Sequence, residues 1–371
     1  MARVRARIVR IGLALLVLGL VTFGPHLAWR LLPAHVLRVV LVDKTVPFLK
    51  YREHAAIPWI LHAMRLTERD GRFLDPAKDY VGYHPETKSG DELRKEALAG
   101  ADALVITDTY GVYVGDYEKP GDVAALERSP KIYGGFSGAE AEVIESFAGN
   151  GGLVLAEFNT FASPTDDATR ARLEHVFGVR WTHWVARYWP NLQDENEVPR
   201  WVGRLYQRVE RHQFDIKGGG LVFVLEDKDI VVLKDGVELG PAVVEQLRTK
   251  AGAEFEFPER GGFWFWMDLV EPMGGEVLFE HVVDVTPEGA ARLAAHGVPR
   301  RFPALVKRAN AWYFAGDFVD TALELGNPER AGLLTYRKRM LGCGGGGTTD
   351  EAFFWGFYVP IVSRLFASRA H

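Results

Sequence analysis

Two short apolar runs, LRVVLV at 37–42 and ALVI at 103–106, decide the fold of this chain. Both are continuous and rich in Val and Ile, which is the pattern of strands that are covered on both faces. A third run of this kind, LVLA at 153–156, lies further along the chain. Strands of this type occur in parallel sheets whose two faces are covered by helices. The three runs therefore predict an α/β protein.

Helical segments separate these runs, as a doubly wound sheet requires. Apolar residues recur at helical spacing over about 53–66, and a further helix is predicted over about 167–177. Ser137 and Glu140 have the spacing of a capping box, which begins a helix that ends before the glycines near 149–152. This order of elements predicts a doubly wound, mostly parallel sheet.

After residue 183 the pattern changes. Strand-like runs at 221–225 and 230–233 and a short helix near 243–249 indicate an inserted α+β portion, and FWFWM at 263–267 is strongly β-prone. A strand over 277–283, a helix near 287–296 and the run WYFA at 312–315 follow, and we expect WYFA to rejoin the first sheet. The expected segments are a basic cytoplasmic tail (1–10), a transmembrane signal anchor (11–29), an α/β domain (36–183), the inserted α+β portion (184–275), a return to the main sheet (276–340), and a Gly-rich loop with a C-terminal apolar helix (341–371).

The N-terminal segment predicts a single membrane span. Residues 11–29 are apolar apart from Thr22 and His26, and a helix of this length approaches the thickness of the bilayer core, about 30 Å. The arginines at 3, 5, 7 and 10 precede it without an acid, which favours a cytoplasmic N-terminus and a main domain outside the cytoplasm, in the periplasm or at the cell surface. A cleaved signal peptide is the alternative, but the bulky residues at 26–29 offer no small-residue cleavage site.

Composition excludes several classes of function. The net charge of −5 over 371 residues argues against nucleic acid as a partner. A single cysteine, Cys343, excludes an internal disulfide and a cysteine-based zinc site. The sequence has no G-x-G-x-x-G or HExxH motif, and the glycine run at 342–349 has no P-loop lysine. No cofactor is indicated by any motif.

Four acids, Asp43, Asp108, Glu157 and Asp317, each follow a predicted parallel strand. Open α/β sheets bind ligands at the carboxyl ends of their strands, so these acids are candidate catalytic residues. Two carboxylates in different environments can divide acid and base roles, and three could instead hold a hard cation, although no metal site is assigned. The alternative is that each acid caps the loop or helix that follows it. Candidate ligand-binding residues near them are Lys44, His54, Tyr110, Asn159 and Asp320.

Aromatic residues are dense around 181–206 and 263–266. Flat rings can stack on the faces of sugars, which suits a protein of the cell envelope. The alternative is that they fill the core, since consecutive aromatic residues in a strand point to both of its sides.

The runs LRVVLVDKT (37–45), ADALVITDTYG (101–111), GNGGLVLAEFNTF (149–161) and WYFAGDFVD (312–320) resemble, in order and spacing, the class I glutamine amidotransferase-like superfamily. The resemblance covers about half of the chain and implies a flavodoxin-like sandwich. Active relatives carry a nucleophilic cysteine in a G-x-C-x-G turn after a buried strand, where this chain has AEFNT at 156–160. Because the thiolate is the nucleophile of that chemistry, the resemblance implies a member without amidotransferase activity.

Three hypotheses for function remain. The first is a membrane-anchored, extracytoplasmic amidotransferase-like domain that binds an envelope ligand, which we expect to be a glycan. The second is a carboxylate-dependent hydrolase that uses the same crevice. The third is a scaffold whose aromatic surface contacts another membrane protein. The tether between the anchor and the first strand is about eight residues and can extend only some 25 Å, so the crevice should lie close to the membrane.

Overall fold

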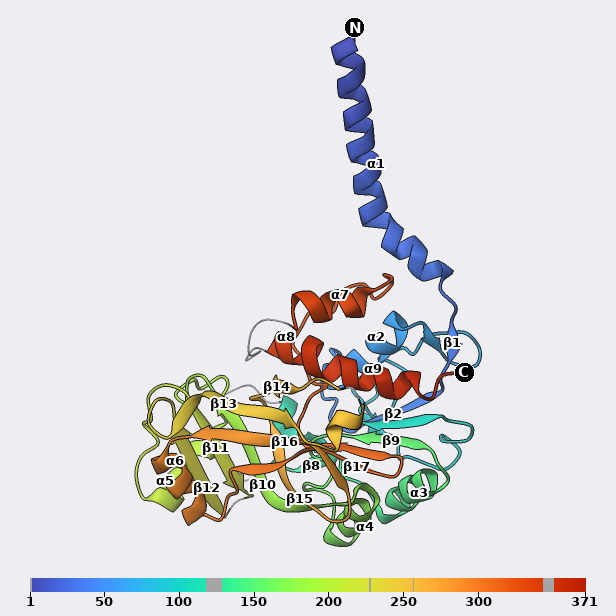
Figure 1. The fold of residues 1–371 in the computed structure, drawn as a ribbon. Helices are drawn as coiled ribbons and strands as arrows, with labels where there is room; N and C mark the ends of the chain where they lie inside the picture. Colours follow the sequence, from blue (N-terminus) through green and yellow to red (C-terminus); the bar gives the residue numbers. More distant parts are fainter. Residues whose placement is uncertain (1, 118–128, 227, 256, 343–349) are drawn as a thin grey trace.

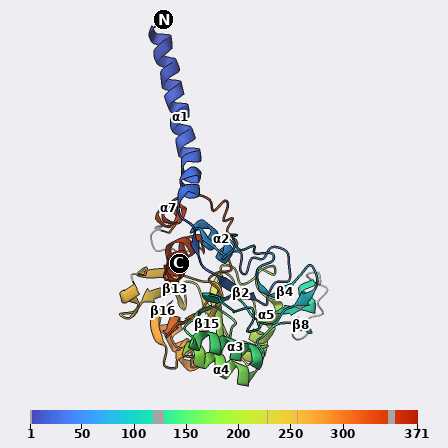
Figure 2. The same ribbon diagram turned by 90° about the vertical axis from the view of Figure 1, so that its right-hand side faces the viewer.

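A computed structural model describes residues 2–117, 129–226, 228–255, 257–342 and 350–371. Cys343 and most of the glycine run at 342–349 therefore lie outside the described residues. Helix α1 (Ala2–Leu31) projects from a globular part that holds all the other described elements (Figure 1). A view from the side shows the same separation (Figure 2).

The main sheet has ten strands. In spatial order they are β14 (Arg260–Gly262), β13 (Leu239–Arg248), β16 (Glu276–Val285), β17 (Arg301–Arg308), β18 (Ala311–Phe314), β9 (Leu153–Ala156), β6 (Ala103–Ile106), β2 (Val39–Asp43), β4 (Val81–His84) and β5 (Ser89–Gly90). The three apolar runs at 37–42, 103–106 and 153–156 form neighbouring strands near its centre, and the run at 312–315 rejoins them as β18, as expected.

The parallel part of this sheet consists of β4, β2, β6, β9 and β18. Numbered along the chain, these five strands have the spatial order 2-1-3-4-5, an order that flavodoxin also has. The other five pairings of neighbouring strands are antiparallel. The sheet is therefore mixed, and the prediction of a mostly parallel sheet holds only for its five-stranded core. The extension escaped prediction because strand pattern alone does not fix the direction of pairing.

A second sheet of four antiparallel strands packs beside the first. Its strands, in spatial order, are β12 (Asp229–Lys234), β11 (Gly220–Leu225), β10 (Val179–Trp189) and β15 (Met267–Pro272). Two further pairs are β1 (His35–Val36) with β3 (Leu66–Thr67), and β7 (Val112–Tyr113) with β8 (Lys131–Tyr133). The portion at 184–275 is not a separate unit, because β10 begins before it and β13 and β14 belong to the main sheet.

Two local predictions are wrong. The residues at 243–249, expected to be a helix, lie mostly in β13, which pairs with β16 over most of its length, so tertiary pairing decides the conformation of this short run. The residues 263–266 of FWFWM form no strand, and only Met267 enters β15. Their rings instead pack in different parts of the core: Phe263 contacts Phe318, and Trp266 contacts Trp189.

Helices cover both faces of the main sheet (Figure 1). On one face lie α2 (Ala56–Ala63), α8 (Asp350–Phe353), the π-helix η3 (Phe354–Tyr358) and α9 (Val359–Ala367), with α7 (Leu333–Met340) above them; on the other lie α3 (Gly138–Gly149) and α4 (Asp167–Phe177). Helix α5 (Arg200–Glu210) packs on the second sheet, α6 (Pro287–Ala295) contacts both sheets, and η1 (Val114–Tyr117) and η2 (Gly252–Phe255) are single turns.

The side chains of the central strands alternate between these two layers. Leu41 and Val105 belong to the cluster that includes α2 and α9, and Val42 and Leu104 belong to the cluster that includes α3 and α4. All four are at most 1% exposed, which explains why these strands read as continuous apolar runs. The same alternation separates the polar residues that end β2.

Helix α1 is long and apolar enough to cross a membrane. Its large apolar side chains are exposed from Ile8 to Phe23, a length of about 24 Å in a helix. The end of the predicted span is instead packed on the globular part: Trp29 is 4% exposed and donates from its indole Nε1 to the carbonyl of Ala63 (3.2 Å). Only three residues separate Leu31 from β1. The tether is thus shorter than the sequence predicts, and the globular part adjoins the exposed apolar stretch directly.

Candidate functional site

The carboxyl ends of the parallel strands gather three of the four acids singled out from the sequence. Asp43 ends β2, Asp108 follows β6, and Asp317 follows β18. Glu157 follows β9 and lies at the same edge, but its contacts differ. These side chains are 0% (Asp43), 7% (Asp108), 1% (Glu157) and 7% (Asp317) exposed, so the acids form a largely buried group at this edge of the sheet, the region called the crevice below.

The Asp43 carboxylate is held by His54, which the sequence predicts only as a candidate ligand-binding residue. The His54 Nδ1 lies 2.6 Å from Asp43 Oδ2, and its Nε2 lies 2.7 Å from the carbonyl of Pro76. A carbonyl only accepts, so Nε2 carries a hydrogen and a second hydrogen is shared between Nδ1 and the carboxylate. Gly82 permits the neighbouring strand to approach, because a Cβ at this position would lie 1.6 Å from the carbonyl oxygen of Asp43. Asp43 is therefore fixed in place at the base of the crevice.

Thr45 links Asp43 to Asp108. Its backbone N–H donates to Asp43 Oδ1 (2.9 Å), and its hydroxyl donates to Asp108 Oδ1 (2.9 Å). The backbone N–H of Tyr110 also donates to Asp108 Oδ1 (2.6 Å), and the Asn159 amide lies 3.3 Å from Oδ2. Burial, with the charge of Asp43, outweighs these hydrogen bonds and raises the pKa of Asp108 to about 7. Near neutral pH this group is divided between its acid and its carboxylate forms.

Glu53, which directly precedes His54 in the sequence, is a further acid of this group, as its place in the sequence beside the strand-end carboxylates predicted. Burial and the neighbouring charge of Asp43 raise its pKa to about 8. Asp320, which was predicted, lies beside it and accepts a two-point hydrogen bond from the guanidinium of Arg52.

Asp317 differs from Asp43, Asp108 and Glu157 because its carboxyl group makes no hydrogen bond among the described residues. Burial, then the charges of Asp320 and Asp108, raise its pKa well above the usual range. A buried acid without a partner is costly unless it is protonated or receives a ligand. Asp317 is thus the least satisfied polar group of the crevice.

Glu157 has a structural position under the loop that carries Asp317. Its Oε2 accepts from the backbone N–H groups of Phe318 and Val319 (2.9 Å each), and its Oε1 accepts from the Tyr358 hydroxyl (2.5 Å). Burial nevertheless raises the pKa of Glu157 to about 8. Because both oxygens are occupied, Glu157 positions the loop rather than facing a ligand, and its predicted catalytic role has no support in this geometry.

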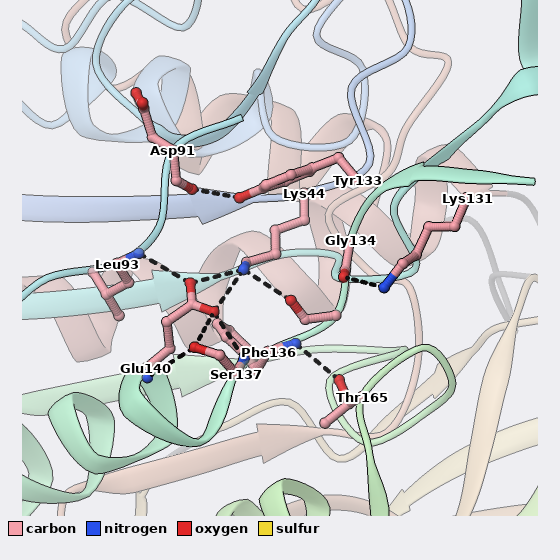
Figure 3. A network of polar contacts seen from close by, with 11 residues as sticks. Lys44, Asp91, Leu93, Lys131, Tyr133, Gly134, Phe136, Ser137, Glu140 and Thr165 are labelled. Atoms are coloured by element: carbon pink, nitrogen blue, oxygen red, sulfur yellow. Dashed lines mark hydrogen bonds and ion pairs between the residues drawn. The ribbon is translucent and has the colours of Figure 1, made fainter. Parts of the chain in front are cut away.

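Lys44, the residue after β2, extends toward the first turn of α3 and lies beside Glu140 (Figure 3). Its ammonium donates to both oxygens of Glu140 (2.7 and 2.9 Å) and to the carbonyl of Gly135 (2.8 Å). Glu140 also accepts from the backbone N–H groups of Leu93 and Ser137 (2.9 Å each), the second of which completes the predicted capping box of α3. Burial lowers the pKa of Lys44, although Glu140 opposes this. The predicted ligand-binding lysine is therefore not brought to the carboxylates.

Asn159 lies at the turn after β9, where the resemblance places the nucleophile of amidotransferases. It has a left-handed backbone (φ +66°), and its N–H donates to Asp268 Oδ2 (3.2 Å). Asp268, also bonded by the Tyr313 hydroxyl, is a buried acid that sequence analysis missed; burial raises its pKa to about 7. The only signal for it is an isolated acid in the apolar run MDLV at 267–270. The turn carries an amide where a thiol would be required.

Aromatic side chains and one arginine border the Asp317 side of the crevice. The backbone N–H of Asp317 donates to the carbonyl of Trp266 (2.9 Å), and Phe265 and Trp266 are half-buried. The Arg187 guanidinium lies over both rings, 4.3 Å from the centroid of Phe265 and 5.5 Å from that of Trp266. Its charge interacts with Asp317 and Arg52. On the other side, Tyr110 is half-buried at the rim.

The described residues contain no group of three or more His, Cys, Asp or Glu side chains arranged to hold a metal ion. The crevice instead contains carboxyl groups whose pKa values are raised toward neutrality, the amide of Asn159 and the guanidinium groups of Arg52 and Arg187. Together these groups can donate and accept hydrogen bonds, as the hydroxyl groups of a ligand do. They do not require that the ligand be charged.

No protein-family model and no curated protein matches this chain. Among solved structures, it is similar to a glutamine amidotransferase from Thermotoga maritima, with 12% identity over 90% of this chain and 97% of that one and a TM-score of 0.36. A protein described as ThuA-like from Parabacteroides merdae has 12% identity over 76% of this chain and 78% of that one, with a TM-score of 0.34. A cytoplasmic protein from Salmonella typhimurium has 12% identity over 90% of this chain and 100% of that one, with a TM-score of 0.37. These TM-scores are too low to assign a family or a function.

Proposed function

We propose that this protein is a single-pass membrane protein whose globular part lies outside the cytoplasm and binds an envelope glycan in the crevice at the carboxyl ends of its parallel strands. In this proposal the core is a flavodoxin-like member of the class I glutamine amidotransferase-like superfamily without amidotransferase activity. The observation that carries the proposal is Asp317, a buried carboxyl group that makes no hydrogen bond with any of the described residues and lies beside two half-buried aromatic rings.

Hydroxyl groups suit the polar part of the crevice. Asp108, with a pKa of about 7, and Glu53, with a pKa of about 8, can each donate or accept a hydrogen bond near neutral pH. A sugar hydroxyl that donates to Asp317 would supply the partner that its carboxylate lacks. The side chains of Asn159 and Arg52 stand at the same crevice as further donors.

The aromatic border suits the apolar part of a sugar. Phe265 and Trp266 are half-buried, so part of each ring is accessible. Aromatic side chains combine a flat apolar face with little conformational entropy to lose, which favours stacking on a pyranose ring. The position of the crevice on a part that adjoins the exposed stretch of α1 favours a ligand close to the bilayer.

The turn after β9 supports the absence of amidotransferase activity in this proposal. That reaction needs a thiolate to attack the amide of glutamine. At this turn the chain has Glu157, Phe158 and Asn159; the first is bonded to backbone N–H groups, and the third donates to Asp108. Neither side chain can form the covalent intermediate of a cysteine.

Retention of the full-length protein, in lipid nanodiscs, on cell-wall and exopolysaccharide fractions tests the proposal. We expect the wild type to be retained on one of these fractions. Asp317→Asn and Trp266→Ala should each reduce retention about tenfold, the effect of removing one hydrogen-bond partner or one aromatic contact at a binding site.

Two matched variants control this experiment. Asp167, 94% exposed on α4, and Trp201, 37% exposed on α5, lie outside the crevice, so Asp167→Asn and Trp201→Ala should be retained like the wild type. Failure of the wild type to bind any fraction, or equal losses in the control variants, would contradict glycan binding.

A reporter that is active only outside the cytoplasm, fused after His371, tests the orientation. Activity is expected if the arginines before α1 keep the N-terminus inside. A silent reporter on a membrane-bound protein would place the globular part in the cytoplasm.

A carboxylate-dependent glycan hydrolase is the second candidate, and the division of the acids favours it. Asp43 is bonded to His54 and Asp320 to Arg52, whereas the pKa of Glu53 and that of Asp108 are raised toward neutrality. Acids whose environments differ in this way can act as acid and base. Release of soluble sugar by the wild type and its loss in Asp108→Asn would establish hydrolysis; retention without release would leave binding alone.

A further inference from the structure

Helix α7 lies on the side of the globular part from which α1 emerges (Figures 1 and 2). The segment before it contacts the end of α1 directly. The N–H of Ala331 donates to the carbonyl of Pro25 (2.9 Å), and the ring of His26 donates through Nδ1 to the carbonyl of Glu329 (2.8 Å). The position of α7 is therefore fixed relative to the point where the apolar stretch of α1 ends.

The charged residues of α7 and of the segment directly before it are all basic. Residues 330–340 contain Arg330, Arg337, Lys338 and Arg339 and no Asp or Glu. Arg330, Lys338 and Arg339 are exposed, and Arg30, in the last turn of α1, has 64% of its side chain exposed. Four cations are thus presented around the base of the membrane helix.

The acids nearest to these cations are already engaged. Glu329 lies between His26 (3.5 Å), His62 (3.4 Å) and Arg30 (3.9 Å). Glu351 interacts with Arg337, whose guanidinium turns inward over the ring of Trp355 (4.4 Å). Arg337 therefore anchors α7 to the globular part and leaves the outward charge to its neighbours.

Large apolar side chains accompany the exposed cations. Tyr336 is 61% and Met340 62% exposed on α7, and Leu31 is 77% exposed at the end of α1. Tyrosine and apolar residues that alternate with Lys and Arg are the composition of helices that rest at the interface of a membrane. A protein partner would not require this combination of cations and apolar side chains at the base of the membrane helix.

We propose that α7 rests on the surface of the bilayer that holds α1, with Lys338, Arg339, Arg330 and Arg30 against anionic lipid headgroups and Tyr336 and Met340 in the interfacial layer. This inference rests on the proposed membrane span of α1. Each basic residue near an anionic membrane surface strengthens binding about fivefold, so α7 would hold the globular part in one orientation on the bilayer.

An environment-sensitive fluorophore on Met340→Cys, in a Cys343→Ser background of the full-length protein, reports this contact. The labelled protein is reconstituted in vesicles of phosphatidylcholine with or without phosphatidylglycerol. In vesicles with phosphatidylglycerol we expect blue-shifted emission and quenching by lipid-borne quenchers, both of which decrease at high salt. Lys338→Glu with Arg339→Glu should weaken this association at least about tenfold.

The matched control reverses two exposed charges far from α1, Arg204→Glu on α5 with Lys217→Glu after it, and should behave like the parent protein. Emission that is the same in both kinds of vesicle, or unchanged by the reversal on α7, would overturn the lipid contact. Extraction with alkaline carbonate separates the two proposals. Protein that resists extraction while its label stays in water contradicts only the contact of α7, whereas protein that is extracted contradicts the anchor and this inference together.

Discussion

Asp43 and Lys44 are adjacent in the chain, yet their side chains enter two different environments on opposite faces of β2. Lys44 meets Glu140, and every polar atom of that pair has a partner from the backbone or from each other. Asp43 lies near several other carboxyl groups, among them those of Glu53 and Asp108. One side of the strand is balanced in charge; the other has an excess of carboxyl groups.

The difference shows what each region does for the protein. Lys44 and Glu140 join β2 to the capping box of α3, and their contacts are complete without a ligand. In the crevice, the pKa values of Glu53, Asp108 and Asp317 are raised because burial and repulsion are not compensated. Uncompensated groups of this kind cluster at functional sites, where stability is given up for binding or chemistry. The comparison can be tested by changing one region at a time.

The largest effect is expected on the balanced side. Lys44→Met leaves the carboxylate of Glu140 buried without its cation, which should lower the free energy of unfolding by about 3–5 kcal/mol. Chemical denaturation in detergent micelles measures this change. The double variant Lys44→Met, Glu140→Leu should recover part of the loss, because no isolated charge remains. A single variant as stable as the wild type would show that the pair is not structural.

The crevice should make the protein less stable as the pH rises. The pKa of Glu53 (about 8) and that of Asp108 (about 7) lie above the usual values, so the folded state binds more protons than the unfolded state near neutrality. Their stabilisation is complete at low pH and is lost as the pH rises through these values. Between about pH 6.5 and about pH 8.5 we expect Tm to fall by about 5 °C or more.

Two other buried groups respond to pH with the opposite sign. Burial lowers the pKa of His281 to about 3, so this residue destabilises the folded state only at pH values below the usual histidine pKa. Burial lowers the pKa of Lys44 as well. The double variant Glu53→Gln, Asp108→Asn therefore serves as the reference. Its Tm should change less over the same interval, and equal slopes for variant and wild type would assign the effect to other groups.

The smallest change in stability is expected from Asp317→Asn, and it should be a gain. The amide removes a buried acid that has no hydrogen-bond partner, so the free energy of unfolding should rise by about 1 kcal/mol at pH 8, while glycan retention falls. Asp167→Asn, at an exposed position, should change neither quantity. Loss of stability in Asp317→Asn would mean that this carboxyl group is a structural element like Glu157.

Part of this organisation could be predicted residue by residue. The strands at 39–43, 103–106 and 153–156 were found because they are buried on both faces, and the helix begun by Ser137 because its capping box is local. The strand β17 and the strand conformation of 243–248 were missed or misassigned. Their conformation depends on pairing with β16, a partner distant in sequence, and periodicity within a short run does not record such a partner.

The sequence by itself determined the apolar N-terminal helix, the buried strands, the acids at their carboxyl ends and the lack of a cysteine after β9, because each of these is a property of a few consecutive residues. Only the tertiary structure decided which acids lie together. It directed Lys44 to Glu140, satisfied Glu157 with backbone N–H groups, left Asp317 without a hydrogen bond to any described residue and brought in Asp268. The physical reason is that the fate of a charge depends on burial and on partners, and both come from elements far apart in the chain.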